Sequence, residues 1–162
     1  MTEDAPRFAF DGQRLRAETI AAVARRTVAF GPLIRAGKLD EGDANRELNA
    51  WLTLRDEWCR AASAMPDAPM IAPASPAQCL AALQVALTRA DRQLNKLIAA
   101  LPAEAYRAAR NGALLSQLAD QFGDVVTPML AAHDTRDAIE ALLWWQQRGG
   151  PLALPQPQRA AA

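Results

Sequence analysis

The chain has 162 residues, of which 51% are hydrophobic, and this is enough apolar material for one domain with a sizeable core. This composition excludes a largely disordered protein. Lys plus Arg number 18, as do Asp plus Glu, so the net charge is zero and gives no support to the coating of nucleic acid or an anionic membrane.

Targeting signals and membrane spans are not apparent. The start MTEDAPRFAF is acidic and lacks the apolar run of a signal peptide. No stretch approaches the roughly 18 apolar residues that span a bilayer. Two cysteines, Cys59 and Cys79, form no metal-binding pair and are expected to be reduced. We expect a cytoplasmic protein without a membrane partner.

The N-terminal part predicts a helical hairpin over residues 13–64. The first helix begins after Asp11 and is interrupted at Gly31-Pro32, where a further short turn begins. Gly37 is placed for the left-handed conformation that ends a helix. Asp40 is the expected N-cap of the second helix, with an acid three residues later.

The middle of the chain is rich in proline, with four between residues 66 and 76. This density excludes a helix interior and predicts an extended connection over 65–75. Ser75 followed by Pro76 and Gln78 is a strong helix start, because it combines a cap, a proline at the first position and a capping box. Leucines spaced by three and four then continue to Leu101, and Pro102 ends the helix.

The C-terminal part predicts shorter helices. One covers 103–110, another 114–122, and a helical stretch follows with Pro128 in or near its first turn. Asp134 or Thr135 is expected to cap the last helix, which runs through Arg148. The chain is thus predicted to be all-α, a bundle of about four main helices plus two or three short ones, in a single domain 1–150 with helices over 76–148 and an extended, flexible tail 151–162.

The segment GPLIRAGKLDEGDANRELNAWL, residues 31–52, resembles helical hairpins of primase- and helicase-associated proteins of mobile elements. The likeness rests on the glycine turn and the leucine spacing. It implies a helical hairpin and a phage or mobile-element origin, and no functional residue is transferred from it.

Charge alternates along the chain. Residues 14–38 hold six basic side chains and one acid, whereas residues 40–57 hold six acids and two basic side chains. One interpretation is charge complementarity between neighbouring helices. The other is a basic face on the first helix, with Arg14, Arg25 and Arg26 contacting phosphates or an acidic protein.

The residues and motifs that most kinds of catalytic site require are missing from the sequence. The single histidine, His133, cannot form a two-histidine metal site and is expected to be solvated or to cap the helix that follows. Phosphate-binding and dinucleotide-binding glycine motifs are missing, and Ser75 is used as a cap. We therefore predict no catalytic residues, no metal site and no cofactor, although an enzyme with acids and arginines between helices stays a third hypothesis.

Arg55 interrupts the apolar stripe of the second helix, between Trp51 and Trp58. A buried guanidinium without a partner is costly, so three interpretations remain. Arg55 pairs with an acid of another helix while its head stacks on an indole. Alternatively, a Trp51–Arg55–Trp58 ladder forms an exposed protein-binding surface, or the ladder stacks on nucleic-acid bases.

The adjacent Trp144 and Trp145 point about 100° apart on a helix. Trp145 falls on the apolar arc of the last helix, whereas Trp144 lies opposite it. If Trp144 faces outward, it either stacks on Arg148, four residues on, or docks into a partner subunit. Trp144 is therefore covered by a loop or tail of the chain, docks into a partner or a second copy, or is exposed without a role.

The leading hypothesis is a non-enzymatic protein-binding protein, namely an adaptor, an inhibitor or a small subunit of a larger assembly. Its partner is another protein or a second copy, and its candidate site residues are Trp144, Arg148, Trp51, Arg55 and Trp58. The alternative is a nucleic-acid-associated accessory protein that uses Arg14, Arg25 and Arg26.

Overall fold

The computed structural model describes residues 4–62 and 74–151, and within these ranges the protein is all-α, as predicted. Of the predicted connection over 65–75, residues 65–73 lie outside the described residues, as does the predicted tail beyond Pro151. The helices are α1 (Gly12–Arg35), α2 (Glu41–Ala61), α3 (Pro76–Ala99), α4 (Ala103–Arg110), α5 (Leu115–Phe122), the 3₁₀ helix η1 (Gly123–Val126) and α6 (Thr127–Gln146).

The predicted start of α1 and the predicted turn between α1 and α2 are confirmed. Asp11 caps α1 by accepting a hydrogen bond from the Arg14 backbone N–H at 2.9 Å. Gly37 has φ of 67°, and the N–H of Lys38 reaches back to the carbonyl of Leu33 at 2.9 Å, which is the pattern of a glycine-terminated helix. Asp40 then caps α2.

The predicted interruption at Gly31-Pro32 is wrong, because α1 continues to Arg35 with Pro32 inside it. A proline removes one N–H donor and disturbs the carbonyl four residues earlier, here that of Val28. The Val28 side chain is 77% exposed, so water can reach this side of the helix. The cost is therefore confined to one hydrogen bond in the last turns.

Helix α3 begins as predicted, with both hydrogen bonds of the capping box between Ser75 and Gln78 present. The short helices predicted over 103–110 and 114–122 are observed as α4 and α5, with nearly the same bounds. The prediction that a separate last helix begins at Asp134 or Thr135 is wrong, however. Both residues lie inside α6, which begins at Thr127 and ends at Gln146. The Asp134 carboxylate accepts from Arg7 at 2.8 Å and is not used as a cap.

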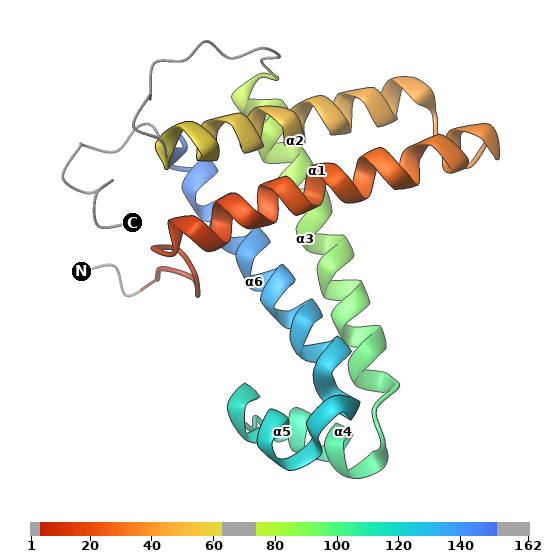
Figure 1. Cartoon of the computed structure of the whole chain (residues 1–162), viewed down its shortest axis with the longest axis vertical. Helices are drawn as coiled ribbons and strands as arrows, with labels where there is room; N and C mark the ends of the chain where they lie inside the picture. The colour runs from red at the N-terminus through yellow and green to blue at the C-terminus, as the bar shows by residue number, and fades with distance from the viewer. Residues whose placement is uncertain (1–3, 63–73, 152–162) are drawn as a thin grey trace.

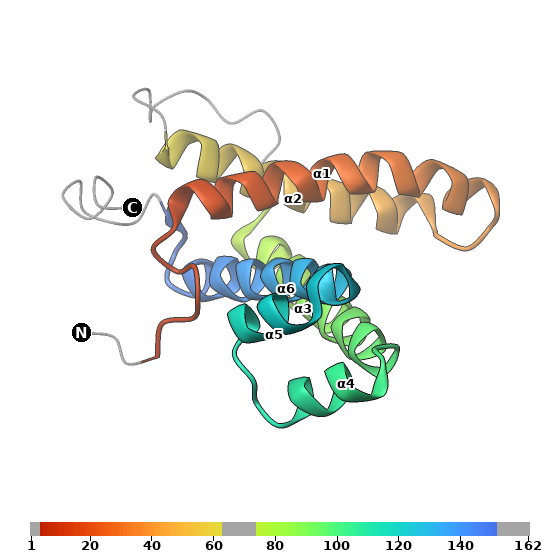
Figure 2. The ribbon, with the colours of Figure 1, turned by 60° about the horizontal axis from the view of Figure 1, so that its bottom comes forward.

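The hairpin of α1 and α2 lies across the pair formed by α3 and α6, and Figure 2 shows the two pairs as separate layers. A first buried cluster fills the crossing and draws on all four helices; its largest members are Trp51, Trp58, Trp145, Leu15, Leu54, Leu83, Ile139 and Leu142. Helices α4 and α5 cover the opposite end of α3 and α6 (Figure 1) around a second, smaller cluster.

Candidate protein-binding surface

Trp145 belongs to the crossing core, as its position on the helix predicted. It is 5% exposed and packs edge-on against Trp58, with ring centroids 6.3 Å apart. Its indole N–H donates to the backbone carbonyl of Ala9 at 2.5 Å. The segment before α1 therefore runs over the end of α6 and closes this side of the core.

Trp144 is partly covered by the same segment. The Phe10 ring meets it edge-on at 6.0 Å, and the Arg148 guanidinium lies 3.9 Å from the centre of the indole. The predicted stacking of Arg148 is thus confirmed, and part of the covering comes from the chain itself. The Trp144 Nε1 has no hydrogen-bond partner among the residues that the structure describes.

Phe10 was missed by the sequence reasoning, although its place directly before the Asp11 cap is a favoured position for an apolar residue. It contacts both tryptophans, yet 57% of the residue stays exposed. Phe10, Trp144 and Arg148 together form a surface that we call the aromatic patch. Its composition, two aromatic rings and an arginine, is that of residues that dominate binding energies at protein interfaces.

The Trp51–Arg55–Trp58 ladder is not a surface, and this prediction is wrong. Trp51 is 0% and Trp58 5% exposed. Arg55 lies at the edge of the core and pairs with its neighbour Asp56, with Nη2 and Oδ1 3.2 Å apart, so the partner on another helix is wrong as well. A helical wheel cannot say how far the covering helices extend, and here they bury Trp51 and Trp58 but leave the Arg55 side chain between them 36% exposed.

The guanidinium that stacks on Trp51 comes instead from Arg26 of α1, 4.3 Å from the ring. Arg26 also donates to Glu47 of α2 at 2.9 Å, and burial lowers the pKa of its guanidinium. Arg25 pairs with the buried Glu18 at 2.5 Å. Two of the three arginines proposed for phosphate contact are therefore engaged within the protein, while Arg14 lies over the Phe8 ring at 5.5 Å.

The ion pairs support the first interpretation of the alternating charges, which is charge complementarity between neighbouring helices. Glu47 of α2 also accepts from Arg89 of α3 at 2.8 Å. Arg136 of α6 donates to Asp91 of α3 at 2.9 Å and to Glu140 one turn on. The Glu47–Arg89 pair joins the two crossing layers, whereas the Arg136–Asp91 pair joins α3 and α6 within one layer.

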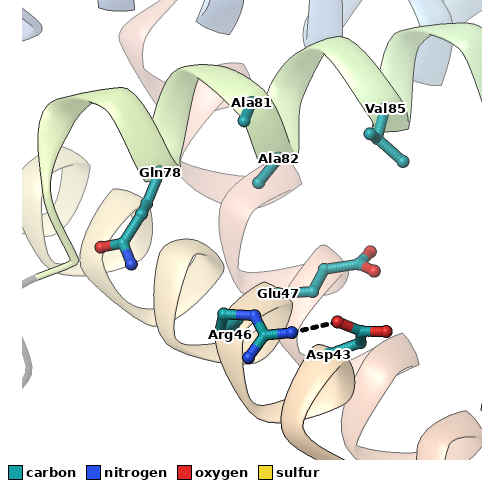
Figure 3. A pocket seen from close by; sticks show the side chains of 7 residues that line it. All are labelled: Asp43, Arg46, Glu47, Gln78, Ala81, Ala82 and Val85. Atoms are coloured by element: carbon teal, nitrogen blue, oxygen red, sulfur yellow. Dashed lines mark hydrogen bonds and ion pairs between the residues drawn. The ribbon is translucent and has the colours of Figure 1, made fainter. Parts of the chain in front are cut away.

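A shallow groove of about 380 Å³ lies between α2 and α3. Figure 3 shows Ala81, Ala82 and Val85 on one side, and Asp43, Arg46 and Glu47 on the other. Asp43 pairs with Arg46, and Glu47 is shared by two arginines, so the charges of the groove are already matched. The groove therefore supplies an apolar wall but no convergent set of uncompensated charges.

The remaining titratable groups do not gather into a site. His133 lies inside α6, with Nδ1 3.0 Å from Asp137, so the predicted cap before a helix start is wrong. Burial raises the pKa of Glu57, and burial together with that carboxylate raises the pKa of the Cys79 thiol to about 12. Within residues 4–62 and 74–151, no three His, Cys, Asp or Glu side chains are placed to hold a metal ion.

Comparisons with other proteins add no function. The chain matches no protein-family model, no curated protein and no solved structure at a significant level. Among the described helices, none combines the length and the hydrophobicity that crossing a membrane requires.

Proposed function

We propose that the protein is a non-enzymatic protein-binding module, an adaptor, inhibitor or small subunit of a larger assembly, and that it binds another protein through the aromatic patch. The observation that carries the proposal is the exposed Phe10 ring, 57% accessible, resting on Trp144 beside a stacked Arg148. Exposing so large an apolar ring to water is unfavourable, and a partner that covers it gains this energy.

The geometry of the patch supports a binding role more than a purely structural one. Trp145 is buried in the core and holds the preceding segment through the Ala9 carbonyl, whereas Trp144 is only partly buried against the same core. Trp144 adds a second indole whose N–H has no acceptor in the described part of the chain. An acceptor from a partner would satisfy this donor once the partner rearranges the surface around it.

The nucleic-acid hypothesis has less support. Arg26 is largely buried between two helices, and Arg25 is balanced by Glu18. A phosphate backbone attracts uncompensated cations, and binding would require these pairs to break. Of the proposed contacts, only Arg14 is not paired with a carboxylate among the described residues.

The test is affinity capture from a lysate of the source cells with the immobilised full chain and with two patch variants, Phe10→Ala and Arg148→Glu. A specific partner should be retained by the wild type and reduced at least about tenfold by each variant, since central aromatic and arginine residues commonly contribute over 1.4 kcal/mol. Tyr106→Ala is the matched control, because this ring is 38% exposed on α4, far from the patch.

Far-UV circular dichroism should show that all variants keep the helicity of the wild type. Light scattering behind a sizing column separates a heterologous partner from self-association. A mass near 17.5 kDa for the free protein fits the proposal. A dimer that Phe10→Ala converts to a monomer would assign the patch to self-association and overturn it, as would capture that is insensitive to both patch variants.

A further inference from the structure

A second surface, the outer face of α1, is apolar and is not covered by any of the residues that the structure describes. The buried residues of α1 are Leu15, Glu18, Thr19 and Ala22. On the opposite side, within an arc of about 100°, all residues between Gln13 and Arg35 are apolar or glycine. They are Ala17, Ile20, Ala21, Ala24, Val28 and Gly31. Ile20 is 43% and Val28 77% exposed, and α1 crosses in front of α3 and α6 in Figure 1.

The edges of this face are basic. Arg16 lies on one side and Arg14 on the other, and Arg35 lies at the C-terminal end. Within the described part of the chain, none of these three has a carboxylate partner; Arg35 is exposed, whereas Arg14 and Arg16 are partly buried and their Nε atoms are buried without a hydrogen-bond partner. The one acid of α1, Glu18, is buried and holds Arg25.

We infer that the outer face of α1 binds an acidic amphipathic helix of another protein. The small side chains Ala17, Ala21 and Ala24 allow a second helix to approach closely, at the short end of the 8–10 Å range of packed helices. Apolar residues of that helix would cover Ile20 and Val28. Glutamates or aspartates along both edges of its apolar stripe would meet Arg14 and Arg16.

The basic edges and the apolar centre favour an acidic helix over two other occupants, namely a second copy of the chain and a nucleic acid. A second copy of the chain, packed face to face, would place the basic edges of two α1 helices against each other, and like charges at an interface are costly. A nucleic-acid backbone would meet the arginines but would leave the apolar centre uncovered. An acidic helix satisfies both the centre and the edges. This inference does not depend on the aromatic patch.

The experiment uses the full chain and two fluorescent synthetic peptides of about 21 residues, long enough to form helix in water. One carries an alanine and leucine stripe with glutamates on both edges, and the other carries lysines at the same positions. Fluorescence anisotropy should show saturable binding of the glutamate peptide that weakens with added salt, and at least about tenfold weaker binding of the lysine peptide.

Three variants locate the binding. Val28→Asn removes apolar area without adding charge, and the double variant Arg16→Gln with Arg35→Gln removes two cations. Each should lower the affinity for the glutamate peptide severalfold. Arg92→Gln, an exposed arginine of α3, is the control for overall charge and should leave the affinity unchanged. Helicity measured by circular dichroism should be equal in all of them.

Other outcomes overturn the inference. Equal binding of both peptides would indicate a non-specific apolar surface. Unchanged affinity in Val28→Asn would place the peptide elsewhere. A dimer in light scattering that Val28→Asn dissociates would assign the face to a second copy, and binding to anionic lipid vesicles that the same variant abolishes would assign it to a membrane surface.

Discussion

Two regions of the molecule are closed by buried clusters that are built differently. One is the crossing of the four long helices, and the other is the far end, where α4 and α5 cover the ends of α3 and α6. The crossing holds three of the four tryptophans and joins residues that are far apart in sequence. The far end contributes one residue from each of its elements, namely Leu94, Ala105, Leu118, Val126 and Met129. Because apolar burial stabilises in proportion to area, the crossing carries most of the stability.

The helices around the two clusters differ in the same way. α1, α2 and α3 have side-chain caps and 21 to 24 residues, whereas α4 and α5 have eight residues each and follow the N-cap residues Pro102 and Leu114, which make no side-chain cap hydrogen bond. Helices this short are not stable alone and depend on their packing. The comparison suggests that the far end opens locally while the crossing stays folded.

Trp51→Ala should give the largest loss of stability, about 3–5 kcal/mol, because it leaves a cavity in the crossing and removes the ring on which Arg26 lies. Equilibrium urea unfolding followed by circular dichroism measures this loss. Tyr106→Ala on exposed α4 is the control and should change stability by less than about 0.5 kcal/mol. Similar losses for the two variants would mean that the crossing is not the main core.

Glu47→Gln should cost about 3 kcal/mol, because it leaves Arg26, whose side chain is only 12% exposed, without its carboxylate. The matched control is Asp43→Asn, which removes an exposed ion pair with Arg46 one turn earlier on α2. Exposed pairs contribute at most about 1 kcal/mol. Unfolding curves that shift equally for both variants would show that burial of the Arg26–Glu47 pair has no special weight.

Leu118→Ala tests the far end. Its side chain is 2% exposed in the second cluster, and its truncation should reduce local stability by about 2–3 kcal/mol. Hydrogen exchange measured by mass spectrometry should accelerate in peptides covering 103–126 and stay unchanged in α1 and α2. Uniform acceleration over the whole chain would show one cooperative unit in place of two.

Glu57→Gln should give the smallest effect, with the opposite sign. Burial raises the pKa of Glu57 in the folded state, so the ionised carboxylate destabilises the fold at neutral pH. The variant should have the higher melting temperature at pH 7. Its advantage should shrink as the pH falls through the raised pKa and vanish below the ordinary value of 4.5, where the wild-type side chain is protonated in both states. Glu104→Gln, an exposed glutamate of α4, is the control and should show no such pH-dependent gain.

The sequence predicted well where the cause is local. Asp11, Asp40 and Ser75 each cap the helix that follows, because the acceptor and its backbone N–H are three residues apart in the chain. It failed at Pro32 and Asp134, whose side chains are typical of helix ends. In both cases the helix continues, because its own hydrogen bonds and packing outweigh one lost donor or one unused cap.

The candidate surfaces show a similar division. Trp145 on the core side and Arg148 stacked on Trp144 follow from helical geometry and could be derived from spacing. The role of Phe10 could not, because it depends on the segment before α1 folding back over the end of a helix more than 130 residues later. The exposed face of α1 likewise requires knowledge of which side α2 and α6 cover.

By itself the sequence determined the helical class and most helix starts, since these depend on spacings of about one helical turn. Only the tertiary structure decided which arginines are buried and which stay at the surface. Arg26 lies between Trp51 and Glu47, whereas Arg35 at the end of the same helix is exposed. The physical reason is that burial depends on where distant helices cross, and a charge pattern along one helix does not specify that crossing.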